Sequence, residues 1–387
     1  MSKAPFDDSA LMETTESHPA LRQPYARRWM DWLQTITFLL GAVLLYYVIS
    51  RTGVQPIFAA LSKVGFAFFL VVAINGLRQV LRTIAMSVSV PRKHRHFTFL
   101  QAFAARLGGE SISFLTFGGL TGQATKIALL RRRVPLVHGV PALVVDNVLY
   151  NLSVVLMILG GACLVLFTYS VPLIARGILI VIAAAAFLGL VAAAMAMLRR
   201  VTLLTRTIDG LARRGFRPRF LKTQRDHIYW IELTVYEFYK HRRPAFLKMI
   251  GLDLASHLAS VLEVYVILKV LGVTANVSAA YIIESLTKVI TFAFGFVPGT
   301  IGVYETGNAI ILRILGFTTA VGVALAIVRK AASVFWTVIG VLVITWGRAR
   351  AIITEAALAR KRIAKDQEEI DVLKTETREV LRRVRGA

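Results

Sequence analysis

The sequence predicts an all-α membrane protein with about six transmembrane helices and two broken re-entrant helical hairpins arranged as an inverted repeat. Three observations lead to this fold class: long apolar blocks, basic residues gathered in a few segments, and two interrupted apolar segments that resemble each other. The chain is 56% hydrophobic, with a mean hydropathy of +0.64. This composition is typical of membrane proteins, because a soluble core is built from shorter apolar runs.

Six apolar blocks are long enough to cross a bilayer core about 30 Å thick as helices. In chain order they are Trp32–Ser50, Phe66–Val90, Gly139–Phe167, Val171–Leu198, Phe246–Leu271 and Thr318–Trp346. The residues before the first block are polar, and no small-residue cleavage site follows it, so we expect this block to be an uncleaved insertion signal. Cys163 is the only cysteine, which excludes an internal disulfide and a thiolate metal cluster.

The formal net charge of +24 raises the question of a nucleic-acid partner, and the position of the charges answers it. Most Lys and Arg residues fall before residue 29, in 92–95, 131–133, 199–225 and 240–248, and after residue 347. If the six spans alternate, all of these segments lie on one side of the membrane. This positive-inside pattern predicts that both termini are cytoplasmic and that the basic loops meet anionic lipid headgroups, not nucleic acid.

Two further apolar segments, 97–133 and 279–316, are broken at their centres by glycine or proline. Given the six spans, each segment begins and ends on the same side, so each has to enter the membrane and turn back. Non-helical backbone at membrane depth requires protein or a water-filled cavity to cover its free N–H and C=O groups. The breaks therefore predict an internal cavity.

The two broken segments align with each other. Gly118-Gly119-Leu120-Thr121-Gly122 matches Pro298-Gly299-Thr300-Ile301-Gly302 at an offset of 180, and 139–143 matches 322–326 at an offset of 183. They enter from opposite faces, which is the inverted-repeat layout of secondary transporters. The predicted organisation is a cytoplasmic segment 1–28, a transmembrane domain 29–348 with repeat halves at about 97–167 and 279–346, and a cytoplasmic helical tail 349–387. We expect 199–227 to lie as a helix in the cytoplasmic interface.

Ionisable residues inside a membrane are costly, so each is a candidate for function. Asp253, His257 and Glu263 occupy the fifth span. The candidate substrate-binding residues of the two repeats are Arg106, Glu110, Gly119, Gly122, Lys126, Asp146, Glu284, Lys288, Pro298, Gly299, Gly302, Glu305, Arg329 and Lys330. The glycines of the breaks expose helix-end N–H groups that favour anions, or they allow close helix packing instead.

Asp146 and Arg329 hold equivalent repeat positions with opposite charges. They could form a buried ion pair. Alternatively, Arg329 and Lys330 meet a lipid phosphate while Asp146 or Glu110 accepts a cationic headgroup, since the arginine fork can donate two hydrogen bonds to a phosphate. The sequence contains no catalytic constellation with a supporting scaffold, so we expect no catalytic residues, metal or cofactor.

The stretch Pro298-Gly299-x-x-Gly302-x-x-Glu305, the earlier Gly-Gly-x-x-Gly break and the spacing of the spans resemble the lysylphosphatidylglycerol synthase transmembrane (flippase-like) family. The resemblance covers about 29–348. It implies a protein of the bacterial inner membrane and, for the best-understood members, translocation of an aminoacylated phospholipid between leaflets. Other stand-alone members are linked to hopanoid or polyprenyl-phosphate-sugar pathways. The family pattern also leads us to expect an acidic residue followed by Arg where this sequence has Asp146-Asn147.

Bifunctional members of that family carry a soluble synthase domain after the membrane part, whereas about 40 residues follow Arg348 here, so we expect a stand-alone member that is a transporter and not an enzyme. The leading hypothesis is a lipid translocase for an aminoacylated or other anionic phospholipid, or for an isoprenoid or hopanoid lipid. The alternatives are a membrane-embedded lipid transferase and a non-catalytic scaffold that recruits lipid-synthesis enzymes. Self-association into a homo-oligomer is left open.

Overall fold

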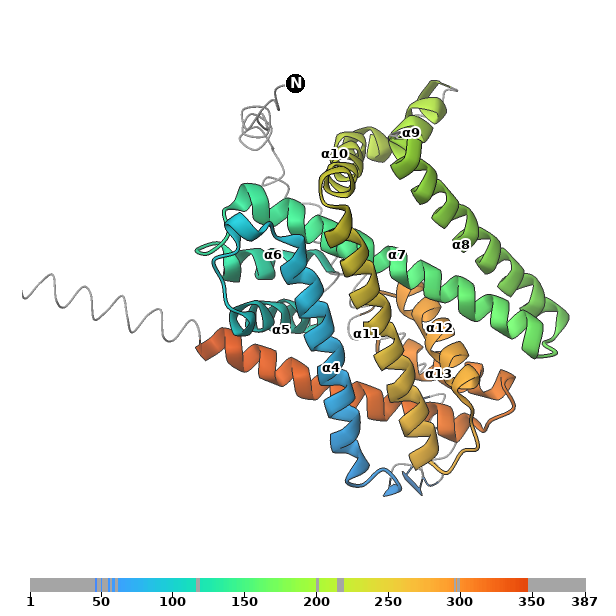
Figure 1. Ribbon diagram of the computed structural model, residues 1–387. Helices are drawn as coiled ribbons and strands as arrows, with labels where there is room; N and C mark the ends of the chain where they lie inside the picture. The colour runs from blue at the N-terminus through green and yellow to red at the C-terminus, as the bar shows by residue number, and fades with distance from the viewer. Residues whose placement is uncertain are drawn as a thin grey trace, which may run out of the picture.

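The computed structural model describes residues 46, 50, 55, 58, 59, 62–115, 119–199, 202–213, 219–295, 297 and 300–346. All regular structure in these residues is helical, which confirms the predicted fold class (Figure 1). The first predicted span, Trp32–Ser50, falls almost wholly outside them, with only Tyr46 and Ser50 described and both helical. The predicted segments 1–28 and 349–387 also lie outside the described residues.

The described helices follow one another with short connections. They are α4 (Ala67–Ser89), η1 (Arg92–His94), α5 (Phe99–Leu115), α6 (Gly119–Leu130), α7 (Leu136–Thr168), α8 (Leu173–Arg199), α9 (Leu203–Arg213), α10 (Arg219–His241), α11 (Arg243–Val270), α12 (Val277–Ala293), α13 (Val303–Ile314) and a final helix, Thr319–Trp346.

Five of these helices are long and apolar enough to cross a membrane: α4, α7, α8, α11 and the Thr319–Trp346 helix. They correspond to the second to sixth predicted spans. The largest differences from the predicted bounds lie at the starts of α7 and α11, and a proline explains the observed start of each of these two helices. The helix α7 begins at Leu136, directly after Pro135, and α11 begins at Arg243 with a proline in its first turn, where a missing N–H costs no helical hydrogen bond.

Both interrupted segments form helical hairpins of the same dimensions. The helices α5 and α12 have 17 residues each, and α6 and α13 have 12 each. The second break ends at Gly302, whose φ of +80° lies in the left-handed region that glycine tolerates and whose N–H donates a 2.7 Å hydrogen bond to the Glu305 carboxylate. In the first hairpin, Gly119 and Gly122 belong to the start of α6, so the helix resumes earlier than the predicted break at 118–122.

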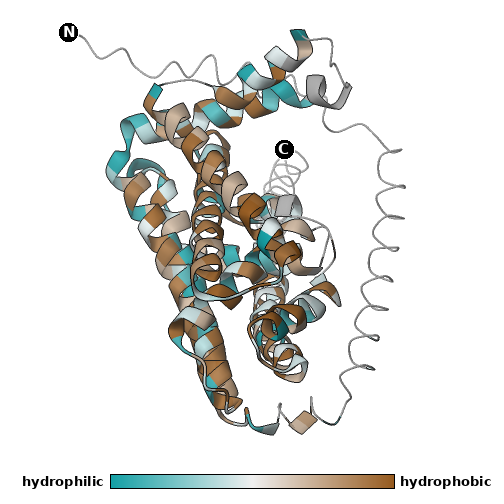
Figure 2. Cartoon of the chain, turned by 90° about the vertical axis from the view of Figure 1, so that its right-hand side faces the viewer, coloured by the Kyte–Doolittle hydropathy of each residue, from teal (hydrophilic) through white to brown (hydrophobic). Residues whose placement is uncertain are grey.

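The helices α4 and α11 pack along each other at the centre of the bundle, with the α5/α6 hairpin beside α4 and the α12/α13 hairpin beside α11 (Figure 1). The main hydrophobic core joins α11 to α12 and to the final helix through residues such as Ile267, Ile283 and Leu325. Hydrophobic residues dominate the long helices, and hydrophilic residues are frequent on the helices at the upper end in Figure 2. The bundle therefore presents apolar surfaces along its length, and it buries some charged residues, such as Arg82, Asp146 and Glu263, between helices.

The predicted interfacial helix at 199–227 corresponds to α9 and the first part of α10. The carboxylate of Glu232 on α10 accepts hydrogen bonds from the backbone N–H groups of Leu204 and Thr205 at 2.7 and 3.1 Å, so it caps the start of α9. Arg225 donates two hydrogen bonds to Asp209, at 2.6 and 2.9 Å. These contacts attach α9 to α10, and the hydrogen bonds from Arg225 hold the pKa of Asp209 below its usual range.

Candidate functional site

A polar cavity of about 200 Å³ lies at the centre of the bundle, between α4, α11, the α12/α13 hairpin and the Thr319–Trp346 helix. Polar side chains from each of these helices line it, including Asn75 on α4, Thr287 on α12 and Ser333 on the final helix. A cavity of this kind, inside helices that otherwise expose apolar surfaces, is the feature that the broken segments predicted.

The cavity wall contains a group of four charged residues, the Arg329 cluster, formed by Glu263, Glu284, Lys288 and Arg329. Nη2 of Arg329 lies 2.7 Å from Oε2 of Glu284, and its Nε lies 3.8 Å from Oε1 of Glu263. Lys288 reaches the other oxygen of Glu284 at 3.0 Å. Arg329, Glu263 and Glu284 are each at most 5% exposed, so these ion pairs lie in a low-dielectric setting where an uncompensated charge is costly.

The hairpin break is tied to the cavity through Glu305. One oxygen of its carboxylate accepts the hydrogen bond from Gly302 N–H, and the other accepts a short hydrogen bond from Nζ of Lys330. Nζ of Lys330 also lies 5.6 Å from the centre of the Tyr304 ring. Glu305 therefore both caps α13 and holds a cationic residue of the final helix at the cavity wall.

The charges that line the cavity are unbalanced. Among the described lining residues, Arg78, Lys288, Arg329 and Lys330 are cationic, and Glu263 and Glu284 are anionic. Arg78 donates a 3.4 Å hydrogen bond to the Asn75 side chain and forms no ion pair within the described part of the chain. In the same part, Nη1 and Nε of the buried Arg329 have no hydrogen-bond partner. An anionic group in the cavity would supply acceptors for these donors.

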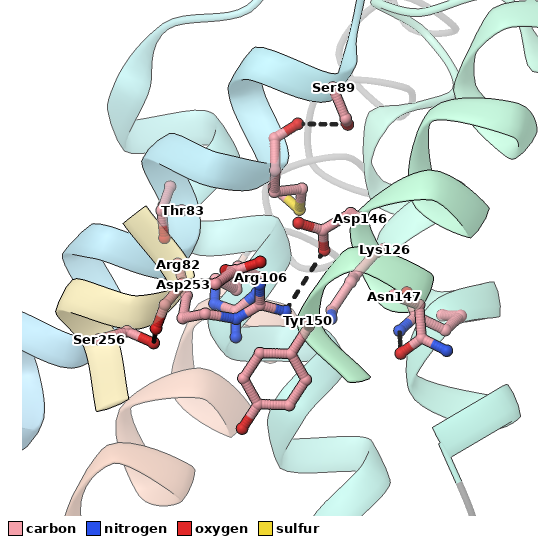
Figure 3. A network of polar contacts seen from close by, with 12 residues as sticks. Arg82, Thr83, Ser89, Arg106, Lys126, Asp146, Asn147, Tyr150, Asp253 and Ser256 are labelled. Carbon is pink, nitrogen blue, oxygen red and sulfur yellow. Dashed lines mark hydrogen bonds and ion pairs between the residues drawn. The ribbon is translucent and has the colours of Figure 1, made fainter. Parts of the chain in front are cut away.

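A second charged group, the Arg82 cluster, lies next to the cavity and consists of the partly exposed Glu110 and of buried residues that Figure 3 shows, namely Arg82, Arg106, Lys126, Asp146 and Asp253. The Arg82 guanidinium donates a short hydrogen bond to Asp253, lies 3.6 Å from Asp146, and stacks 3.9 Å from the centre of the Tyr150 ring. Because Tyr150 also lines the cavity, its ring connects the two clusters.

Glu110 joins the two helices of the first hairpin. Its Oε1 lies 2.9 Å from Nη2 of Arg106 on the same helix and 3.5 Å from Nζ of Lys126 on α6. The Glu110 side chain is 43% exposed, whereas Arg106 and Lys126 are buried. The helices α5 and α6 also pack closely against each other, since a Cβ at Gly122 would overlap the Ser113 hydroxyl and the Gly109 carbonyl oxygen. At Gly122 the structure therefore shows close helix packing.

The structure brings most of the candidate residues into these two groups. Glu284, Lys288, Arg329 and Lys330 line the cavity, Glu305 and Gly302 hold its hairpin, and Arg106, Glu110, Lys126 and Asp146 belong to the Arg82 cluster. Gly119 starts α6, and Pro298 and Gly299 lie outside the described residues. The hypothetical ion pair between Asp146 and Arg329 is not formed, because Arg82 neutralises Asp146 and the two glutamates neutralise Arg329.

Sequence reasoning missed the charged face of α4. Asn75, Arg78 and Arg82 lie at helical spacing within the apolar block Phe66–Val90, so they share one face, but they are not among the candidate residues predicted from the sequence. The helical spacing of these residues could have identified them, because charged residues are costly in a membrane. Their repetition on one face of a span indicates that this face turns toward a polar interior of the protein.

The fold and the buried charges define an all-α membrane protein whose spans surround a polar cavity. The sequence profile of one family, described as "Lysylphosphatidylglycerol synthase TM region", matches residues 34–340. This match spans most of the chain, so the protein belongs to that family, which points to a membrane role in lipid metabolism or transport. No curated protein and no solved structure matches the chain.

Proposed function

We propose that the protein is a lipid translocase that moves an amphiphile with an anionic headgroup between the leaflets of a membrane. The observation that carries this proposal is the central cavity, whose described lining contains four cations and two carboxylates inside a bundle of membrane-spanning helices. Arginine and lysine at such a site bind phosphate oxygens, with the planar fork of arginine donating two hydrogen bonds. The headgroup occupies the cavity while the acyl or isoprenoid tails stay in the bilayer.

The helix order supports a transport cycle built on an inverted repeat. The helices α4 to α7 have 23, 17, 12 and 33 residues, and α11 to the final helix have 28, 17, 12 and 28. In transporters of this layout, the substrate site lies near the membrane midplane where the two halves meet, and access alternates between the two sides. The cavity is lined by residues of both proposed halves, such as Tyr150 and Arg329, which supports a substrate site of this kind.

The substrate class that we propose comprises aminoacylated and other anionic phospholipids and isoprenoid or hopanoid lipids with an anionic headgroup. The location proposed is the bacterial inner membrane, with both termini in the cytoplasm and the basic loops at anionic headgroups. The positive-inside distribution of Lys and Arg supports this orientation.

Arg78→Gln in proteoliposomes tests the proposal. Arg78 has no carboxylate partner in the described part of the chain, so its loss removes a headgroup contact without stranding a buried anion. A lost charged hydrogen bond corresponds to roughly a tenfold or greater loss of apparent lipid affinity. The assay measures the transfer of fluorescent lipids with different headgroups between leaflets.

Arg313→Gln is the matched control, because Arg313 lies on α13, is exposed and is not among the residues that line the cavity. We expect Arg313→Gln to behave like the wild type and Arg78→Gln to lose selectivity for anionic headgroups. Equal rates for all headgroups in the wild type, or an Arg78→Gln variant that keeps full selectivity, would contradict the proposal.

A further inference from the structure

A second, apolar cavity of about 20 Å³ lies at the end of the bundle where α4 ends. Its walls come from the last turns of α4 and α6, the loop after α4 and the start of α7, with Met86, Leu130 and Gly139 among them, and every lining residue is apolar. Among the described residues, it shares none with the central cavity. An apolar cavity offers water no hydrogen-bond partners, so this one suits part of a hydrocarbon chain.

The rim of this apolar cavity is the loop between α4 and α5. Val90 and Phe97, at the two ends of the loop, line the cavity. Between them lie Arg92, which is exposed, and Arg95, which is partly buried. The loop therefore places cationic side chains directly beside apolar walls.

A third arginine, Arg242 at the junction of α10 and α11, reaches the same end of α4. It donates hydrogen bonds to the carbonyl oxygens of Ser89 at 2.7 Å and Val88 at 3.0 Å, and Arg95 donates one to the carbonyl oxygen of Val90 at 3.0 Å. Cations are favoured at a helix C-terminus, because its last carbonyl groups lack helical partners. Capping of α4 therefore explains where these two arginines lie.

The arginine group carries more positive charge than a helix end balances. In the described part of the chain, none of Arg92, Arg95 and Arg242 forms an ion pair. Burial and the neighbouring Arg92 lower the pKa of Arg95, and burial and both other arginines lower the pKa of Arg242. Nε of Arg95 is buried and has no hydrogen-bond partner in the same part of the chain. An anion here would supply the missing acceptor and relieve the repulsion between like charges.

The ligand that fits both the arginines and the apolar walls is an amphiphile. A phosphate group accepts hydrogen bonds from arginine, and a hydrocarbon chain fits the cavity. A soluble anion or a nucleic acid would use the arginines and leave the apolar cavity empty. Basic pockets between transmembrane helices on the cytoplasmic side bind phospholipid headgroups, and the distribution of Lys and Arg predicts that this end of the bundle is cytoplasmic.

We propose that Arg92, Arg95 and Arg242, together with the apolar cavity beside them, bind one anionic phospholipid of the leaflet at this end of the bundle. The phosphate lies against the arginines, and a short stretch of one acyl chain enters the cavity. The lipid contacts α4, α7 and the start of α11, so it links helices of both proposed halves. It is a resident of the protein and not its cargo, so this site does not depend on the proposed function.

Native mass spectrometry of the full chain tests the site by counting the lipids that the protein retains in detergent. The probes are phosphatidylglycerol, phosphatidylcholine with the same tails, and glycerol phosphate, which lacks tails. We expect the wild type to retain phosphatidylglycerol preferentially, and Arg92→Gln/Arg95→Gln to lose roughly tenfold or more in affinity, as for a lost charged hydrogen bond. Equal retention of phosphatidylcholine, or equally tight binding of glycerol phosphate, would overturn the proposal.

Two further variants separate the site from general effects. Arg206→Gln is the matched control, since Arg206 is an exposed arginine on α9 at the same end of the bundle (Figure 1), and it should retain the lipid like the wild type. An equal loss in Arg206→Gln would indicate diffuse attraction to a basic surface and overturn the site. Gly139→Ala keeps every arginine and adds a methyl group to the cavity wall, 3.4 Å from Cγ1 of Val134, an ordinary contact. It should weaken retention, and unchanged retention would overturn the role of the cavity.

The central cavity is a second place where an anionic lipid binds under the proposed function, and Arg78→Gln distinguishes the two. This substitution alters the central cavity and no residue of the arginine site, so the retained lipid should stay. Loss of the lipid in Arg78→Gln and its retention in Arg92→Gln/Arg95→Gln would overturn the proposal. If the lipid is retained through the arginines and no lipid moves between leaflets, the site stands and the proposed function fails.

Discussion

The pairing of Glu284 with Arg329 makes a strong prediction about stability. Glu284→Gln preserves the shape of the side chain but leaves Arg329 with a single carboxylate, Glu263, at 3.8 Å. Removing one partner of a buried ion pair costs about 3–5 kcal/mol, and although Arg329 keeps its contact with Glu263, Lys288 loses its 3.0 Å ion pair with Glu284. At 2–4 °C per kcal/mol, the unfolding midpoint should fall by roughly 6 °C or more.

A double-mutant cycle separates the pairing from other effects of the substitutions. The assay is the loss of the monodisperse peak in size-exclusion chromatography after heating detergent-solubilised protein. Arg329→Met alone should also destabilise, because Glu263 and Glu284 then lose their shared cation. The double variant Glu284→Gln/Arg329→Met should be less destabilised than the sum of the two single variants, with a coupling of about 0.5–3 kcal/mol. Additive effects would refute the pairing.

The remaining predictions concern helix packing and the α9/α10 contact. Gly122→Ala should destabilise the protein by about 1–3 kcal/mol, because the new Cβ overlaps Ser113 and the α5/α6 hairpin has to open. Gly189→Ala is the control, since no atom lies within 4 Å of a Cβ at this position, and it should be neutral or stabilising in the same thermal assay. The contact between Asp209 and Arg225 should be intact above the unfolded-state pKa of Asp209, near 3.8, and should be lost as the pH falls through its lower folded-state pKa, since protonation removes the anion. Hydrogen exchange of α9 amides measured at several pH values checks this, and α9 exchange that does not change with pH would refute it.

The positions of the spans could be predicted from the sequence because a bilayer imposes a minimum apolar length. All five predicted spans that fall in the described residues became helices, with ends shifted by only a few residues where proline starts a helix. Both interrupted segments became helical hairpins, and in the second one α13 starts directly after Gly302, whose positive φ is a conformation that glycine tolerates.

The partners of the buried charges could not be predicted, because they depend on which helices pack together. The repeat alignment predicts that Asp146 and Arg329 hold equivalent positions with opposite charges, and an ion pair between them was one of its two alternatives. The contact between α4 and α11 instead supplies closer partners, Arg82 for Asp146 and Glu263 for Arg329, alongside Glu284 from α12. Equivalent positions in an inverted repeat are related by symmetry, and symmetry alone does not place them in contact.

The role of the charged face of α4 could not be predicted for the same reason, because it depends on which helices pack against α4. A single arginine in an apolar block is read as an interruption, and only packing shows that Arg78 reaches the cavity while Arg82 joins Asp146 and Asp253. Charged residues spaced four apart in a span therefore identify the helix face that turns toward a polar interior.

The measurement that tests the central claim most directly is leaflet transfer of fluorescent lipids in proteoliposomes that contain the wild-type protein. Lipids that share tails and differ in headgroup are compared under one condition. The cationic excess of the cavity predicts faster transfer of lipids with an anionic headgroup, and loss of this preference in Arg78→Gln. No transfer above protein-free vesicles with any of the lipids would contradict a translocase.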